Sequence, residues 1–207
     1  MSCAYAEFHA LGFDPTVVLV EVPGSPLQYD ITVASGTPEQ QVYRTAGVLA
    51  DPGSQYVVGR GTRVWKARRL DTQTGEVVGE PVALKDAWVD SHREREGDIN
   101  QRIRASAASL PDVNRARLEQ LLLTVVCHGD VIIDGVLDRT RPCTDRDPAT
   151  GLHDSSPKRI KHQHPAPLQV AQTHYRIVFR EVGKSLREES SLPVVFSALA
   201  DACDGKL

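Results

Sequence analysis

The sequence predicts an α+β fold in which an antiparallel sheet packs against one helix, with a further helix near the C-terminal end. Three observations support this fold class. Short β-branched runs bounded by Pro, Gly, Ser and Asp occur in the first fifty residues, which is typical of strands. A compact meander of strands follows over 55–88, and the longer helical patterns come after residue 90.

The first fifty residues contain two predicted strands and one predicted helix. The strands are PTVVLVEV (15–22) and QYDITVAS (28–35). The segment SGTPEQQVYR (35–44) predicts the start of a short helix, because Thr37 suits the N-cap and Pro38 suits the first helical position.

The meander should have three strands joined by tight turns. QYVVGRG (55–61) is the first strand and ends in glycines, and RVWKARRL (63–70) is the second. DTQTGE (71–76) predicts a turn, and VVGEPVALKDAW (77–88) is the third strand.

A helix is expected directly after the meander. Asp90 or Ser91 is its candidate N-cap, and Glu94 stands three residues after Ser91, which is the spacing of a capping box. Ile99 and Ile103 mark its apolar face, and Gly97 weakens the pattern.

The rest of the chain alternates between ordered patterns and a biased segment. A helical stretch (112–126) leads into a strand over 130–138, and a loop rich in Pro, Asp and Ser covers about 141–172. A strand over 174–183 and a final helix over 192–205 complete the expected elements.

Composition excludes several classes of protein. The chain has 207 residues, 41% of them hydrophobic, and a net charge of −3, so no electrostatic drive toward nucleic acid or a membrane surface is expected. Its four cysteines have no CxxC spacing, which is typical of a reduced, intracellular protein. No signal-peptide pattern and no bilayer-length apolar run is found. We expect a cytoplasmic or nuclear protein without nucleic-acid or membrane partners.

Lys85 stands between an apolar strand and an abrupt polar break, in VALKDAW. With the Gly-x-Gly turn at Gly59 and Gly61 and an acidic helix behind it, this layout matches a phosphate clamp. Glycines let backbone amides approach phosphate oxygens, the lysine supplies a charge, and a helix carboxylate holds the lysine stem. The alternative is a plain hairpin turn beside an edge-strand lysine that reaches toward solvent.

Two carboxylates could hold Lys85. Glu96 lies three residues before Ile99 and seven before Ile103, which places it on the inward face of the helix. Glu94 shares a face with Asp98 and should point to solvent, so we expect Glu96 to pair with Lys85, with Glu94 as the second choice.

Several stretches together resemble one known family. VGRGTRVWKARR, VALKDAW and REREGDI are similar to the N-terminal lobe of the fungal-type protein kinase family, a divergent branch of the eukaryotic protein kinases. LGFDPTV and THYRIVFREVGKSL resemble the same family, so the similarity covers most of the chain. The resemblance implies ATP as ligand, phosphoryl transfer to protein as the family activity, and a kinase-like N-lobe fold.

The resemblance also implies residue roles. Lys85 and Glu96 would form the strand–helix ion pair used in catalysis, Phe179 would lie at the back of the nucleotide pocket, and the backbone around Val182 would face the adenine ring. The implied cofactor-binding residues are Gly59, Gly61, Val64, Lys85, Phe179 and Val182. The implied division is a strand-rich N-terminal extension (1–50), an N-lobe with a loop insertion (51–183) and the start of a truncated C-lobe (184–207).

Two departures from the family pattern bear on activity. GRGTRVW has Val64 where a third glycine would be expected, and it is about two residues shorter than the GxGxxGxV loop. No His-Arg-Asp or Asp-Phe-Gly follows Gly183, so the catalytic Asp and the magnesium ligands are missing and Mg²⁺ is expected only with a complete C-lobe. We therefore expect an inactive ATP-binding fragment or, alternatively, a non-catalytic kinase-like interaction module, and enzyme status stays open.

Three further patterns have ordinary explanations. CHGDVIIDG contains His-Gly-Asp, but its order and spacing do not fit a catalytic loop, and we interpret it as a turn ahead of a strand. PKRIKHQH (157–164) is read as a solvated loop rather than a nuclear-import signal. Six residues form no defensible zinc spacing, and no metal site is expected from them: Cys127, His128, Cys143, His153, His162 and His164.

Overall fold

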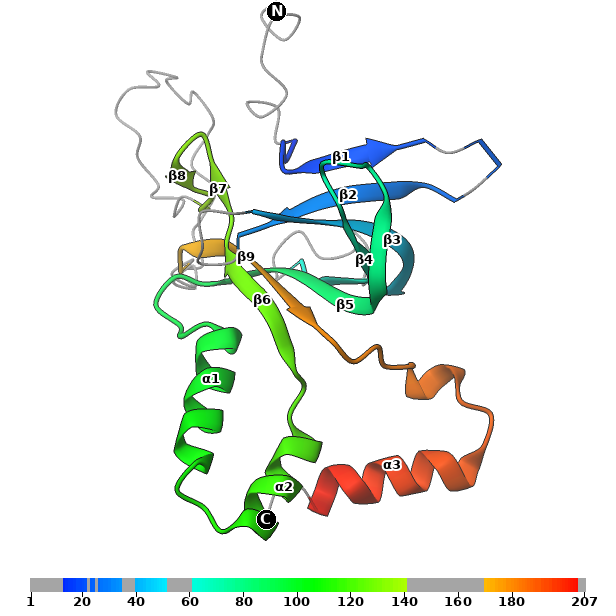
Figure 1. The fold of residues 1–207 in the computed structure, drawn as a ribbon, viewed down its shortest axis with the longest axis vertical. Coiled ribbons are helices and arrows are strands. Elements are labelled where there is room, and N and C mark those ends of the chain that lie inside the picture. The colour runs from blue at the N-terminus through cyan, green and yellow to red at the C-terminus, as the bar shows by residue number, and fades with distance from the viewer. Residues whose placement is uncertain are drawn as a thin grey trace, which may run out of the picture.

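The computed structural model describes residues 13–21, 23–24, 26–34, 40–51, 61–140 and 170–204 of the chain. These residues form an α+β fold with a seven-stranded antiparallel sheet and, in the described segments, three α-helices. Figure 1 shows the sheet at one end of the molecule, with α2 and α3 at the other end. The α+β prediction is therefore confirmed, and the two helical stretches expected after the meander lie between the fifth and sixth strands.

The sheet has the strand order β1-β2-β3-β4-β5-β9-β6. Each neighbouring pair is antiparallel. The strands are β1 (Val17–Val20), β2 (Gln28–Val33), β3 (Gln41–Ala50), β4 (Arg63–Leu70), β5 (Val77–Asp90), β6 (Val125–Asp130) and β9 (Gln172–Phe179). The helices are α1 (Glu96–Ala107), α2 (Asp112–Leu121) and α3 (Leu192–Asp204), with a short 3₁₀ turn at Leu186–Glu188.

Most strands lie where the β-branched runs predicted them, but the helix expected over 35–44 is wrong. Residues 41–44 begin β3, which pairs with β2 on one side and β4 on the other. Two neighbours satisfy the backbone groups of these residues, so sheet pairing excludes a helix over 41–44. Residues 35–39 lie outside the described part.

The strand expected over 55–61 lies mostly outside the described residues. The strand that precedes β4 in the sheet is β3 and not the segment 55–61. The connection that contains Gly59 and Gly61 therefore joins β3 to β4. The expected boundary at residue 50 falls at the end of β3, within a single continuous sheet.

The first helix begins later than its capping pattern suggested. Arg95 precedes α1 and makes no side-chain cap, so the N-cap predictions for Asp90 and Ser91 are wrong. The Asp90 carboxylate instead accepts a hydrogen bond from the His92 amide at 2.9 Å, and this turn ends β5. Asx turns of this kind compete with helix initiation.

The segment after β6 is a hairpin and not one strand. β7 (Ile132–Ile133) and β8 (Val136–Leu137) pair across Asp134 and Gly135, both of which have positive φ (51° and 78°). An Asp-Gly pair with two positive φ angles is the usual sequence of a tight hairpin. His128, Gly129 and Asp130, expected in a turn, belong to β6. Of the expected loop, residues 141–169 lie outside the described part and Gln172 already begins β9.

The sheet curls so that β2 approaches β6, the strand at the far edge of the sheet. A Cβ atom at Gly129 in β6 would lie 2.6 Å from the carbonyl oxygen of Ala34, just after β2. The inner face of this curl holds a core that includes Ile31, Tyr43, Trp65, Leu84 and Val178. The outer face of β5 and β9 holds a second cluster of Ala83, Tyr175, Ile177 and Phe179.

Charged side chains are buried at one end of the inner face. Asp86 is 1% exposed, His174 3% and Arg176 0%. Asp86 is hydrogen-bonded to His174 and accepts a hydrogen bond from Arg176 Nε at 3.3 Å. Arg176 also donates to Asp14 and, at 2.6 Å, to Thr16 Oγ1, so the segment before β1 is held against β9.

The same cluster reaches the hairpin. His174 Nδ1 lies 2.9 Å from a carboxylate oxygen of Asp138, directly after β8, and Trp88 stacks on the imidazole with ring centroids 4.7 Å apart. Burial raises the pKa of Asp86, but the hydrogen bond with His174 and the charge of Arg176 outweigh burial, so its pKa lies below the usual range. The described residues contain no helix long and apolar enough to cross a bilayer.

Arg176→Met tests how much the sheet depends on this cluster. The substitution keeps much of the side-chain volume but leaves the Asp14 carboxylate without its arginine and leaves Arg63, 3.2 Å away and half-exposed, as the one arginine still paired with Asp86 among the described residues. Removing one partner of a buried pair costs about 3–5 kcal/mol of unfolding free energy. Urea unfolding measures it, with Arg115→Gln as control, because the Arg115–Asp112 pair on α2 is exposed and should contribute less than about 1 kcal/mol. A similar small loss in both variants would contradict this account.

Acid should destabilise the fold through Asp86. Because the folded-state pKa of Asp86 is depressed, its contribution is complete above its unfolded-state pKa of about 3.9 and is lost as pH falls through the lower folded value. We expect the free energy of unfolding to fall below about pH 4, and to fall less steeply in Asp86→Asn. Urea midpoints across the acid range measure both slopes. Identical slopes would exclude Asp86 as the source.

Candidate functional site

Side chains alternate between the two faces of β5, so the neighbouring charged residues Lys85 and Asp86 lie on opposite faces. Leu84 and Asp86 face the inside of the curled sheet, whereas Ala83, Lys85 and Ala87 face the opposite side, toward α1. Asp86 is therefore the buried charge of this strand, and the Lys85 side chain is 31% exposed. Lys85 Nζ lies 2.5 Å from Glu96 Oε2, in the first turn of α1.

Three contacts hold the first turn of α1 against the sheet. Arg95 donates two hydrogen bonds to the Asp130 carboxylate in β6, at 2.6 and 3.0 Å. The Gly97 amide donates to the hydroxyl of Tyr175 in β9 at 3.0 Å. Burial raises the pKa of Tyr175, so its hydroxyl stays neutral and keeps this role. Glu96 stands between these anchors, which explains why its carboxylate reaches Lys85.

Gly97 allows α1 to lie close to β6. The His128 imidazole occupies the space that a Cβ atom at Gly97 would need. The glycine that weakened the helix pattern is thus required by packing, since a helix glycine permits a close approach that alanine does not. The alternative partner of Lys85, Glu94, instead pairs with Arg102 at 2.6 Å.

A cavity of about 480 Å³ opens on one side of the Lys85–Glu96 pair. Val64, Ala83 and Phe179 supply apolar walls, and Phe179 is 7% exposed. Its rim follows the segment after β9, with Glu181 and Gly183 lining it. A partly apolar cavity with a few polar groups at its edge is typical of a small-molecule site.

The segment after β9 is held in place by Glu181. The Thr124 amide donates to Glu181 Oε2 at 2.7 Å. Burial raises the pKa of Glu181, but the hydrogen bonds from Thr124 outweigh it, and the pKa lies below its usual range. In the described part of the chain, the backbone groups of Val182 and Gly183 make no hydrogen bond, so they are free to pair with a ligand.

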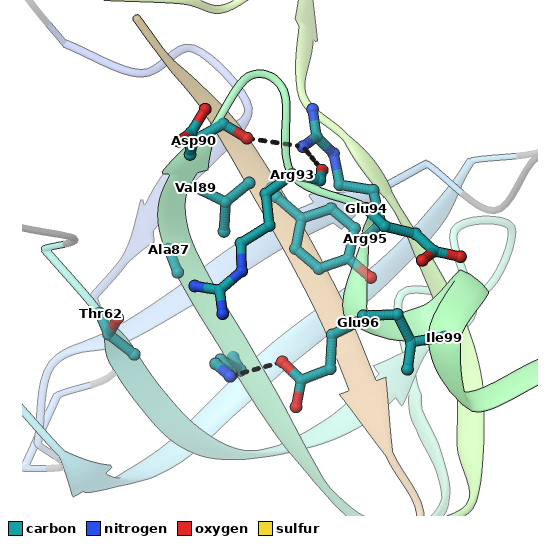
Figure 2. Close-up of a pocket in the computed structure, with 11 residues that line it drawn as sticks. Thr62, Ala87, Val89, Asp90, Arg93, Glu94, Arg95, Glu96 and Ile99 are labelled. Carbon is teal, nitrogen blue, oxygen red and sulfur yellow. Dashed lines mark hydrogen bonds and ion pairs between the residues drawn. The ribbon is translucent and has the colours of Figure 1, made fainter. Parts of the chain in front are cut away.

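A second cavity of about 360 Å³ lies on the other side of the ion pair, between β5 and the start of α1. Figure 2 shows its labelled lining residues, from Thr62 on one wall to Glu96 and Ile99 on the other. The two cavities share only the side chains of Lys85 and Glu96 in their linings. The pair therefore stands at their junction.

The sequence-predicted residues are placed as follows. Lys85, Glu96, Val64 and Phe179 come together at the larger cavity. Gly61 has a φ of 47°, and a Cβ atom there would lie 3.4 Å from Trp88, but the residue lines neither cavity. The Val182 side chain is 36% exposed and stands outside the lining, next to Gly183. Gly59 lies outside the described residues.

Sequence reasoning missed Tyr175, Arg95 and Asp130, which hold α1 in place. Their signal was weak, because their partners lie 78 and 35 residues away in the chain. Of the six His and Cys residues considered for zinc, only Cys127 and His128 lie in the described part, where no group of three potential ligands comes together. Cys127 is instead buried beside the Tyr43 hydroxyl, 3.4 Å away.

A family model described as fungal protein kinase matches residues 1–207. No curated protein and no solved structure matches the chain. The match spans the sheet, α1 and both cavities.

The packing of Gly97 on His128 is testable by a double-mutant cycle. Gly97→Ala should lower the free energy of unfolding by about 1–3 kcal/mol, because the new methyl group overlaps the imidazole. His128→Ala removes the obstacle, so the double variant should be more stable than the sum of the two single losses implies. Urea unfolding gives the coupling energy.

Gly47→Ala in β3 is the matched control, since a Cβ atom there would meet nothing within 4 Å. It should leave stability nearly unchanged. Strictly additive losses for Gly97→Ala and His128→Ala would show that the two residues do not obstruct each other.

Proposed function

Because the chain belongs to the fungal protein kinase family, we propose that its curled sheet and α1 form an ATP-binding lobe. The observation that carries the proposal is the 2.5 Å ion pair of Lys85 and Glu96 at the junction of two cavities. In protein kinases a strand lysine paired with a helix glutamate contacts the nucleotide phosphates. Lys85 and Glu96 are our candidates for these two roles.

The larger cavity suits the nucleoside. Val64, Ala83 and Phe179 would contact the faces of the adenine ring, with Phe179 at the back. The free backbone groups of Val182 and Gly183 would pair with its polar edge, as the donor and acceptor groups of a purine require. The β3–β4 connection, with Gly59 and Gly61, would cover the phosphates.

Lys85 would act as the cation for the phosphates, and Glu96 would act by orienting it. A long lysine stem loses rotamer entropy when it is held in one place, and a fixed carboxylate meets part of that cost before ligand binds. The contacts of Arg95 and Gly97 hold α1, and so the carboxylate, in position. Bound ATP would supply the transferable phosphoryl group.

We propose nucleotide binding without phosphoryl transfer for residues 1–207. Transfer needs an Asp to orient the acceptor hydroxyl and carboxylates to hold Mg²⁺. After Gly183 this sequence has neither His-Arg-Asp nor Asp-Phe-Gly. Protein ligands for the magnesium of a Mg·ATP complex would be supplied only where such groups are present.

A second candidate is a kinase-like interaction module. It is favoured by α3, where Leu192, Val194, Phe196 and Leu199 are 47–68% exposed. Exposed apolar side chains grouped on one element are typical of binding surfaces. The two candidates differ in one respect: only the first requires ATP affinity that depends on Lys85.

Substitution at Lys85 tests the ATP site. Lys85→Met should weaken ATP binding by at least about tenfold, since a hydrogen bond to a charged group contributes about 1.5–3 kcal/mol. Glu96→Gln should weaken ATP binding in the parent chain but not in the Lys85→Met chain, because the carboxylate acts through the lysine. Calorimetric titration measures the affinities, and Arg115→Gln is the control with the same change in charge. Unchanged affinity in Lys85→Met would refute the assignment.

A further inference from the structure

The smaller cavity is lined by an arginine, Arg93, that takes no part in the Lys85–Glu96 ion pair. Three basic side chains line this cavity: Lys85, Arg93 and Arg95. Lys85 is paired with Glu96, and Arg95 is paired with Asp130 through two hydrogen bonds. Across the segments that the structure describes, the Arg93 guanidinium has no hydrogen-bond or ion-pair partner.

The Arg93 side chain extends into the cavity. Figure 2 shows it running beside Val89 and Ala87, with its guanidinium on the side of the cavity where the Glu96 carboxylate lies. Its stem thus follows an apolar wall, as arginine stems commonly do. The charge is placed near the ion pair while its donors stay free.

The charges of Lys85, Glu96 and Arg93 indicate which class of ligand the Arg93 guanidinium would bind. Lys85 and Glu96 together carry no net charge, so the pair alone gives a polyphosphate little net Coulomb attraction. An arginine supplies a full charge and a planar set of donors that matches two phosphate oxygens. Of the carboxylates that line the cavity, Glu94 is paired with Arg102, whereas Asp90 accepts a hydrogen bond from the neutral His92 amide, keeps its charge, and forms no ion pair with Arg93 among the described residues.

We propose that Arg93 is a second phosphate-binding residue and that the 360 Å³ cavity holds the terminal phosphates of a nucleoside triphosphate. This inference rests on the proposed ATP site. The nucleoside lies in the 480 Å³ cavity, the phosphates pass the Lys85–Glu96 pair, and Arg93 binds their far end. Thr62, at the end of the β3–β4 connection, lines the same cavity and offers a hydroxyl donor. The lobe therefore distinguishes a triphosphate from shorter ligands.

The test compares four ligands with and without the guanidinium. Adenosine, ADP, ATP and inorganic tripolyphosphate are titrated into the 207-residue chain and into Arg93→Gln, without divalent metal. Arg93→Gln should weaken ATP and tripolyphosphate by about tenfold and leave adenosine unchanged. Arg115→Gln, with the same charge change on an exposed pair of α2, should leave all four affinities unchanged.

The outcomes separate this inference from the proposed function. ATP affinity that depends on Lys85 but not on Arg93 overturns the inference and leaves the ATP site standing. Tripolyphosphate binding that depends on Arg93, without any binding of adenosine or ATP, supports the anion site and overturns the ATP site. Equal losses for adenosine and ATP in Arg93→Gln would overturn the phosphate role, because they would indicate a general structural effect.

Discussion

The Asp86 carboxylate lies inside the curled sheet, where it is hydrogen-bonded to His174 and paired with Arg176. These partners stand on β9, the neighbour of β5, so their pairing favours one register between the two strands. A shift by one residue would turn Asp86 outward and Lys85 into the apolar interior, at the cost of a buried unpaired charge. The direction of the Lys85 side chain thus depends on the pairing of its neighbour Asp86.

The position of Glu96 depends on a second set of contacts. Arg95 binds Asp130 on β6, and Gly97 donates to Tyr175 on β9, so the first turn of α1 is attached to two strands. His128 fills the space beside Gly97 and limits how α1 can move toward β6. Strand register and helix packing then bring the ammonium and the carboxylate together without a ligand.

Local patterns in the sequence were sufficient for most strands, for α2 and α3, and for the pairing of Lys85 with Glu96 rather than Glu94. These local patterns failed where contacts between residues far apart in the sequence determine the structure. The capping signal at Ser91 was outweighed by the turn at Asp90, and residues 41–44, expected in a helix, pair in β3. The buried cluster was also missed, because Asp14 and Arg176 are separated by 162 residues and neither has a local pattern that indicates a charge pair.

The central claim is that this arrangement places Lys85 in an ATP site. The most direct measurement is covalent labelling with an adenosine analogue that carries a lysine-reactive group in place of the phosphates, followed by peptide mapping. The account predicts modification of Lys85, and predicts that excess ATP suppresses it. Labelling of other lysines instead, or labelling of Lys85 that ATP does not reduce, would contradict the account.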